Sequence, residues 1–498
     1  MWWATAAAAG GVTGLAFPGP DLVVFEILGL TAGLVALARV PSRRGAAGAA
    51  VAFAAGLFGV LLSWSARFGA EAAIGLVAFQ ALLFLPVGLV AGGHRRRRGR
   101  AAWAWAVAAA WVLVDALRIR WPVGGFEWGQ LGFVWHDLPV RSIASLVGTL
   151  GLTGLTVAAC AWVAAVAAGL PAGASGTGRR AAAATALLAV ALVTGSELPW
   201  TRPAGDLDVT VVQIAPVCDG PVVSCPSEDA DVLAAHVAQT AQVTGAPDLL
   251  VWGEGALGGA APRELGRAVV WAAGRLPAPL LAGATSAAGP GRWFNRNVLY
   301  GRDGEVLDTY AKRHPVPFGE YVPARALLGG IGGVGTLVPS DMVPGTEPGR
   351  MEVDSQAFGT VSSLELSVGR EMRAAATGTG GVVGLTLEAS YGRSAVSDQL
   401  LAIVQLRAAE LRKPVLVAAT TGRSTLVGAD GSRGEATGLL SAAVLSERMQ
   451  LRSGSTPFER FGDLPAVLAA LAVLAGPMAV RWEPSGRVRG TAGRRRAR

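Results

Sequence analysis

Two lysines stand out in a chain whose other basic side chains are all arginine. Arginine keeps its proton at any useful pH, whereas a desolvated lysine can lose it. One of the two, Lys312, lies in the segment Tyr310–Pro323, which is rich in proline and glycine and also carries the acid Glu320. A lysine in such surroundings indicates a chemical role.

Two other residues have types and positions that suit the same chemistry. Glu254 directly follows the apolar run Leu249–Trp252 and is flanked by glycines, and Ser363 comes near the end of a predicted strand, 358–365. A carboxylate that takes a proton, a lysine that supports an anionic intermediate and a hydroxyl that forms an acyl-enzyme make up an acyl-transfer site. Taken singly, each has an ordinary alternative: a capping glutamate, a surface lysine and a structural serine.

The elements that must position these residues follow from the pattern after residue 206. Short β-branched runs alternate there with glycine turns and helical stretches. The pattern predicts strands at 208–215, 249–252, 279–285, 358–365 and 382–388, helices at 232–243 and 398–412, and hairpins at 297–310 and 415–428. This alternation is typical of a layered α/β domain with a mixed sheet.

The rest of the chain is much more apolar. Hydrophobic residues make up 52% of the sequence and charged residues 16%, which is unusual for soluble domains. Segments of spanning length, roughly 17–25 residues, can be placed at 1–17, 21–40, 46–65, 72–93, 101–118, 143–170, 181–198 and 463–480. We therefore expect a membrane all-α bundle of about eight transmembrane helices, with the α/β domain inserted before the last one.

Arginine clusters predict the orientation. They fall between alternate spans, at 43–44, 95–98, 179–180 and 494–498. Positive loops mark the cytoplasmic side, so residues 199–462 are expected on the extracytoplasmic side of the plasma membrane. The same clusters explain the net charge of +8 as membrane topology, without a nucleic-acid partner.

Cysteines and histidines are few. Cys160 lies in an apolar span, where a packing role is expected, while Cys218 and Cys225 fall in an oxidising compartment, where a disulfide and two free thiols both remain open. The four histidines form no cluster with cysteine, and no phosphate-binding glycine loop is present. We expect neither a metal nor a cofactor.

Several motifs together resemble the apolipoprotein N-acyltransferase family. The residues that carry the resemblance are Trp252–Leu257, Phe294–Asn297, Tyr310–Pro323, Thr456–Phe458 and the aromatic segment Trp121–Phe133. The resemblance covers essentially the whole chain. It implies transmembrane helices 1–7 in residues 1–200, an extracytoplasmic nitrilase-like α-β-β-α sandwich in 201–462, an eighth transmembrane helix in 463–480 and a basic cytoplasmic tail in 481–498.

The resemblance also implies an activity and roles. The family moves an acyl chain from a phospholipid to the α-amino group of the diacylglyceryl-cysteine of a lipoprotein, so phospholipid, diacylated lipoproteins and the bilayer are the expected partners. By motif, Glu254 is the general base, Lys312 stabilises the intermediate, and Glu320 and Glu365 support the site.

Two segments depart from the family pattern. The family's Cys-Tyr-Glu is replaced here by Ser363-Leu364-Glu365, and its Asn-Asp-x-Trp-Phe-Gly by the segment 387–392. A thiol ionises near pH 8.5, whereas a hydroxyl needs a well-placed base. Three readings follow: a serine-dependent acyltransferase, a catalytically impaired paralogue that binds lipoprotein, lipid or a partner enzyme, and a nitrilase-like amidohydrolase.

Overall fold

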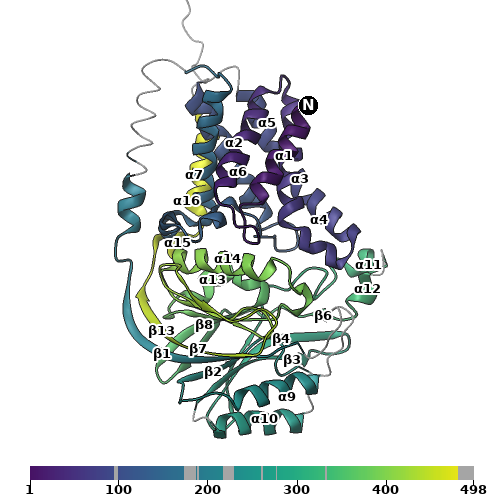
Figure 1. Cartoon of the computed structure of the whole chain (residues 1–498), viewed down its shortest axis with the longest axis vertical. Coiled ribbons are helices and arrows are strands. Elements are labelled where there is room, and N and C mark those ends of the chain that lie inside the picture. Colours follow the sequence, from purple (N-terminus) through teal and green to yellow (C-terminus); the bar gives the residue numbers. More distant parts are fainter. Residues whose placement is uncertain are drawn as a thin grey trace, which may run out of the picture.

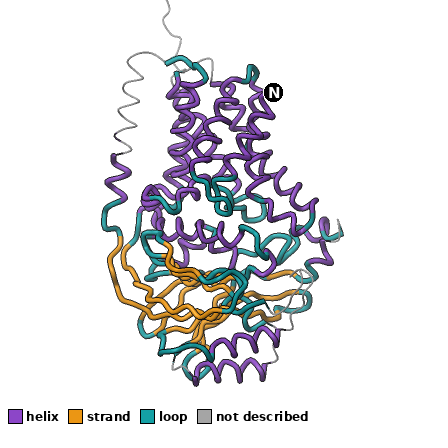
Figure 2. Tube along the Cα trace, viewed as in Figure 1, coloured by secondary structure: helices purple, strands orange, loops and turns teal. Residues whose placement is uncertain are grey.

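A helical bundle stands on a domain of two stacked sheets in the computed structural model (Figures 1 and 2). The structure describes residues 1–94, 99–172, 187, 190–216, 229–258, 262–275, 278–330 and 334–479. Cys218, Cys225 and three of the four arginine clusters lie outside these residues, so the predictions that rest on them stay predictions. Cys160 is free and buried in the bundle, as expected for a packing residue.

The bundle is built from the N-terminal helices and the last helix of the described chain. They are α1 (Trp2–Gly14), α2 (Val24–Arg39), α3 (Arg43–Leu61), α4 (Ala70–Leu82), α5 (Leu85–His94), α6 (Arg100–Arg118), α7 (Ala144–Ala167) and α16 (Leu464–Ala479). Within the described residues, four segments are long and apolar enough to cross a membrane: 43–61, 70–94, 100–118 and 139–167. These helices agree with a membrane protein, and the count of eight spans remains a prediction.

Two of the bundle helices are interrupted. The predicted span 72–93 is divided between α4 and α5, and Pro86 stands at the start of α5, where its missing N–H breaks no helical hydrogen bond. In α7, Gly148 adopts a positive φ of 69°, and a side chain at this position would meet the ring of Phe458. Glycine therefore permits both the bend in α7 and the close approach of the segment that leads into α16.

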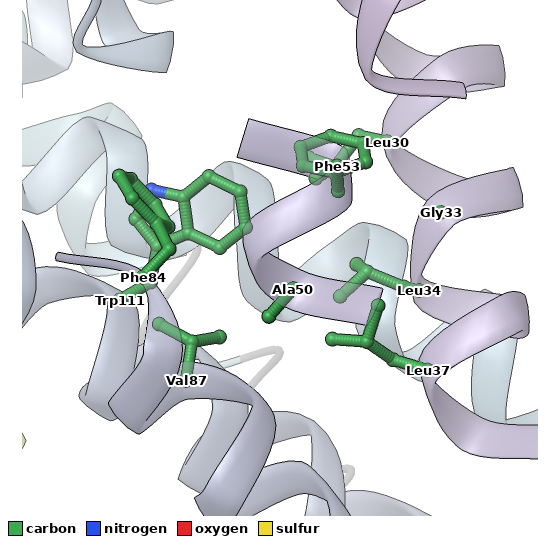
Figure 3. A pocket seen from close by; sticks show the side chains of 9 residues that line it. All are labelled: Leu30, Gly33, Leu34, Leu37, Ala50, Phe53, Phe84, Val87 and Trp111. Carbon is green, nitrogen blue, oxygen red and sulfur yellow. The ribbon is translucent and has the colours of Figure 1, made fainter. Parts of the chain in front are cut away.

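A small apolar cavity lies inside the bundle (Figure 3). Side chains from α2, α3, α5 and α6 surround about 10 Å³ of space, and the rings of Phe84 and Trp111 close one side at 4.9 Å between centroids. This volume is about that of one water molecule, and its lining offers no polar partner in the site. The cavity is therefore a packing defect and not a lipid site.

The lower domain contains a seven-stranded and a six-stranded sheet. The first has the order β13-β1-β2-β3-β4-β5, with β6 beside β4, and the second has the order β12-β11-β10-β9-β8-β7. The strands of the first sheet are β1 (Thr201–Gln213), β2 (Leu249–Trp252), β3 (Leu280–Ala287), β4 (Arg292–Tyr300), β5 (Val306–Ala311), β6 (Asp341–Met342) and β13 (Ala443–Gly454). The strands of the second are β7 (Gly349–Val353), β8 (Gln356–Ser362), β9 (Val382–Thr386), β10 (Val415–Ala419), β11 (Thr425–Val427) and β12 (Arg433–Ala436).

Helices cover the outer faces of both sheets (Figure 1). The first sheet is covered by α9 (Asp229–Thr240) and α10 (Pro262–Arg275), far from the bundle, and the second by α13 (Gly369–Ala376) and α14 (Val396–Leu411), which face the bundle. Apolar side chains of the two sheets, including Val251 and Leu385, form one core between them. The predicted mixed-sheet α/β domain and its α-β-β-α layers are confirmed.

The domain and the bundle share a hydrophobic core. Residues of α14 are buried on every side of the helix, and Leu400 and Ile403 belong to the same apolar cluster as Phe58 and Trp103 of the bundle. A helix that is buried all round lies between two layers and not at a surface. The bundle and the sheet domain therefore pack against each other through α13 and α14.

Candidate active site

The three residues singled out for chemistry lie at the ends of three strands. Glu254 follows β2, Lys312 follows β5 and Ser363 follows β8, in the first helical turn of the short 3₁₀ helix η5 (Ser363–Leu366). Glu254 is 7% exposed and Lys312 is fully buried, whereas Ser363 is partly exposed. The fold thus brings together residues that are separated by 109 positions in the sequence.

Glu254 is oriented by hydrogen bonds to both of its carboxylate oxygens. Asn295 Nδ2 donates to Oε1 at 2.7 Å, and the backbone N–H of Leu387 donates to Oε2 at 2.9 Å. Burial raises the pKa of Glu254, while the Lys312 ammonium and the hydroxyl of Ser363, within hydrogen-bonding reach, oppose the increase. A carboxylate with a raised pKa beside a hydroxyl is suited to accept a proton from it.

Lys312 is surrounded by carboxylates. Its Nζ donates to Glu320 Oε1 at 2.8 Å and lies 3.7 Å from Glu254 Oε1. Burial would lower the pKa of Lys312, but the charges of Glu320, Glu254 and Glu365 together raise it above the ordinary value. The raised pKa favours the protonated, positively charged form of Lys312.

Ser363 has a strained backbone. Its φ is 52°, in the left-handed region that residues with a side chain seldom occupy. The predicted strand 358–365 ends at Ser362, whose hydroxyl donates to Asn297 Oδ1 at 2.8 Å. This hydrogen bond anchors the residue that directly precedes Ser363.

Glu365 joins the serine turn to the lysine loop. Its Oε2 accepts from the N–H of Ser362 and the hydroxyl of Tyr310, both at 2.8 Å. Its Oε1 accepts from the N–H groups of Arg313 and His314 at 2.7 and 2.9 Å. Burial raises the pKa of Glu365 to about 7, against Lys312 and these hydrogen bonds. The predicted supporting role of Glu365 has a geometric basis in these four bonds.

Glu320 fixes the loop on the other side of the lysine. Besides Lys312, its carboxylate accepts from the N–H of Val316 at 2.7 Å and from Asn295 Nδ2 at 3.4 Å. Asn295 therefore contacts two acids of the site. Asn295 belongs to the motif Phe294–Asn297, but the sequence alone indicated no role for it. The signal that could have identified it is a polar residue at a buried position of β4.

The segment 387–392, which departs from the family pattern, nevertheless lines the site. Leu387 supplies the N–H that binds Glu254, and Tyr391 contacts the rings of Trp64 and Phe68 edge-on at 5.4 and 5.6 Å. These two aromatics belong to the 3₁₀ helix η1 (Ser63–Phe68) at the lower end of α3. The segment that follows α3 therefore packs against the segment 387–392.

One group in the described part of the chain has the composition of a metal site. Asp21, His136 and Asp137 place one ligand atom each within 4.8 Å of one another. None of them belongs to the group of Glu254, Glu320 and Glu365 around Lys312.

Family comparisons match both parts of the chain. A model described as the apolipoprotein N-acyltransferase N-terminal domain matches residues 9–162, and the carbon-nitrogen hydrolase model matches 208–453. The apolipoprotein N-acyltransferase of Chromobacterium violaceum is 28% identical over 394 residues, covering 77% of this chain and 74% of the relative. That of Caulobacter vibrioides is 29% identical over 442 residues, covering 84% and 80%.

Among solved structures, that of an amidase from Nesterenkonia sp. is similar at 16% identity and a TM-score of 0.37, covering 51% of this chain and 92% of the amidase. The two family models occur in the order in which the bundle and the sheet domain follow each other here, and the full-length relatives carry both parts in one chain. The chain therefore belongs to the apolipoprotein N-acyltransferase family.

Proposed function

We propose that this protein is an N-acyltransferase that moves an acyl chain from a phospholipid to the α-amino group of the diacylglyceryl-cysteine of a lipoprotein. Family membership supports the reaction class, since relatives over most of the chain bear this name. The observation that carries the proposal for this chain is Ser363, held at a positive φ within reach of Glu254, beside the buried ammonium of Lys312.

In the first half-reaction Glu254 takes the hydroxyl proton of Ser363 as Oγ attacks an ester carbonyl of the phospholipid. The Lys312 ammonium stabilises the negative charge that develops on the carbonyl oxygen. Because the pKa of Lys312 is raised, the ammonium stays protonated. The lysophospholipid leaves as an alcohol with the proton that Glu254 held. The product is an oxyester between the acyl chain and Ser363.

In the second half-reaction the lipoprotein amine attacks the oxyester. Glu254 takes a proton from the amine, and the same proton returns to Ser363 Oγ as the amide forms. An oxyester is a poorer acyl donor to an amine than a thioester, so we expect this second step to limit the rate.

We further propose a topology for this reaction. The arginine clusters support an eight-span arrangement in the plasma membrane, with the sheet domain of residues 201–462 on the extracytoplasmic side. The segment Ser63–Phe68, which precedes a spanning-length segment, contacts Tyr391 beside the site. The site would then face the outer leaflet, which contains the donor phospholipid and the anchored lipoprotein.

The test uses the purified full-length protein in phospholipid vesicles with a diacylated lipopeptide, and mass spectrometry detects the triacylated product. We expect product from the unmodified protein, none above background from Ser363→Ala, and unchanged product from Ser432→Ala, an exposed serine in the β11–β12 turn. Equal product from Ser363→Ala and the unmodified protein would exclude the serine mechanism.

A second variant separates the alternatives. Ser363→Cys should retain or raise the activity, because a thiol ionises more readily and a thioester transfers faster to an amine. Activity in Ser363→Cys but none in the unmodified protein would identify an impaired paralogue with an intact site. Free fatty acid without amide product would identify a hydrolase.

A further inference from the structure

The backbone that follows Ser363 is held by two buried side chains from outside its own sheet. Arg407 Nε and Nη2 donate to the carbonyl oxygen of Ser367 at 3.2 and 2.7 Å. Glu127 Oε2 accepts from the N–H of Gly369, which begins α13, at 3.1 Å. The segment 363–369 is thus fixed at one end by Glu365 and at the other by Arg407 and Glu127.

These two side chains come from the elements that join the domain to the bundle. Arg407 lies in α14, and Glu127 lies in the loop between α6 and the 3₁₀ helix η2 (Leu131–Trp135). Arg407 Nη2 is 2.6 Å from Glu127 Oε2, and both side chains are more than nine-tenths buried. The backbone after the serine is therefore anchored on the membrane side of the molecule.

The anchor extends into the bundle itself. Arg407 Nη1 pairs with Glu410 Oε2 at 2.7 Å, and Glu410 Oε1 accepts from the N–H and the hydroxyl of Thr149 at 2.6 and 2.7 Å. Thr149 follows Gly148, where α7 bends, so its N–H is available to an acceptor outside the helix. A continuous line of charged contacts thus runs from α7 to the turn that carries Ser363.

The geometry requires a guanidinium and a glycine. The guanidinium of Arg407 binds one carbonyl and two carboxylates through N–H donors spread over three nitrogens in one plane, whereas a lysine would offer its three donors from a single nitrogen. A Cβ on Gly369 would lie 3.0 Å from Arg407 Nη1 and 3.4 Å from Glu127 Oε2. Because Gly369 has no side chain, the guanidinium of Arg407 can approach the backbone closely.

We propose that Arg407 and Glu127 are positioning residues for the nucleophile, through which the membrane-side elements set the orientation of the Ser363 turn. This inference rests on the proposed acyl-enzyme chemistry, because it assigns the two residues a role in placing Ser363. It predicts that changes at the pair slow the attack of Ser363 while leaving the binding of phospholipid almost unchanged. A purely structural pair would lower stability alone.

The test compares Arg407→Lys and Glu127→Gln with a control at a second buried ion pair, Lys413–Glu459, whose charged atoms are 2.8 Å apart. Arg407→Lys keeps the charge but loses the fork, and Lys413→Arg changes the cation of the control pair without contact to the segment 363–369. All proteins are studied in vesicles, well below their unfolding midpoints, with single-turnover formation of the acyl-enzyme as the readout.

We expect acyl-enzyme formation to slow about 10- to 100-fold in Arg407→Lys, as a misplaced reactive group does, and less in Glu127→Gln, with KM for phospholipid within about twofold. Lys413→Arg should lower the unfolding midpoint but keep the unmodified rate. An unmodified rate in Arg407→Lys, accompanied by a lower unfolding midpoint, would overturn the inference.

A second readout does not depend on acyl transfer. Each change is repeated in the Ser363→Cys background, and alkylation of the introduced thiol by iodoacetamide is followed by mass spectrometry of its peptide. Reactivity depends on the placement of the thiol beside Glu254 and Lys312, so Arg407→Lys should slow alkylation about 5-fold or more. Equal alkylation rates in Ser363→Cys with and without Arg407→Lys would overturn the positioning role. Slower alkylation in a protein that forms no acyl-enzyme supports it while refuting the proposed function.

Discussion

The two lysines of the chain occupy sites that are alike in burial and unlike in surroundings. Lys312 and Lys413 are 0% and 1% exposed, and each Nζ lies 2.8 Å from a glutamate oxygen. Lys413 completes its bonding with one carboxylate, Glu459, and the carbonyl oxygen of Ala376 at 2.7 Å. The positive charge of Lys413 is therefore paired with one negative charge, that of Glu459.

Lys312 has more negative partners than it can neutralise. Glu320, Glu254 and Glu365 all act on its ammonium, and a serine with a strained backbone lies beside Glu254. The difference teaches that rarity and burial alone do not mark which of the two lysines lies in the candidate active site. What distinguishes Lys312 is the excess of carboxylates around its ammonium, next to the hydroxyl of Ser363.

Replacement of each lysine by an uncharged residue is expected to have the largest effect and to separate the two sites most clearly. We expect Lys312→Met to lower kcat/KM for acyl transfer by about 10³-fold, the loss typical of a group that stabilises an oxyanion. Lys413→Met leaves Glu459 buried and unpaired, which costs about 3–5 kcal/mol of stability, but the folded fraction should keep its activity. Kinetics in vesicles and thermal unfolding measure the two effects separately; equal activity losses in the two variants would show that the sites do not differ in role.

The acid partner of each lysine gives the next largest effect. Glu254→Gln keeps an oxygen for Asn295 but removes the base, so we expect acyl-enzyme formation to fall about 10²- to 10³-fold. Glu459→Gln, the matched change beside Lys413, should leave the rate within about twofold, because Glu459 contacts no residue of the site. Single-turnover kinetics with labelled phospholipid checks both. A fast Glu254→Gln enzyme would exclude Glu254 as the base.

The sequence predicted the elements that depend on local pattern. The run Leu249–Trp252 is β2 with the same limits, and the hairpin turned by Asp303-Gly304 joins β4 to β5. Buried apolar runs and glycine turns are read from neighbouring residues alone. The same holds for the placement of Glu254, Lys312 and Ser363 at strand ends, because a strand end is recognised locally.

The features that decide the chemistry are not local. Ser363, with its positive φ, lies between Ser362, which is bonded to Glu365 and Asn297, and Ser367, which is bonded to Arg407, 40 positions further along the chain. The raised pKa of Lys312 comes from acids on three different segments, so burial alone would have given the opposite direction. Partners this distant in sequence become neighbours only in the folded chain, and no pattern of residue types marks them.

A change at Glu365, which links the turn of Ser363 to the loop of Lys312, is expected to have a smaller effect. Glu365→Gln retains one carbonyl-type acceptor where the carboxylate accepts four hydrogen bonds. We expect the rate of acyl-enzyme formation to fall about 10-fold, since the turn and the loop lose part of their common anchor. Single-turnover kinetics is the measurement. Unchanged kinetics would show that the left-handed turn of Ser363 holds its position without Glu365.

The smallest expected effect is a shift in pH dependence. The reaction needs Glu254 ionised and Lys312 charged. The pKa of Glu254 is raised, so the acid limb of kcat/KM should have its midpoint above the usual value of 4.5, and the pKa of Lys312 is raised above 10.5, so no loss is expected on the alkaline side below that pH.

Glu320 supplies part of both shifts, because its negative charge disfavours ionisation of Glu254. Glu320→Gln removes that charge, so the pKa of Glu254 falls and the acid limb should move to lower pH by about half a unit to one unit. Glu459→Gln should not move it. A pH profile of kcat/KM for each variant checks the sign: movement of the limb to higher pH in Glu320→Gln would mean that the group titrating there is not Glu254, since loss of a neighbouring negative charge cannot raise the pKa of a carboxyl.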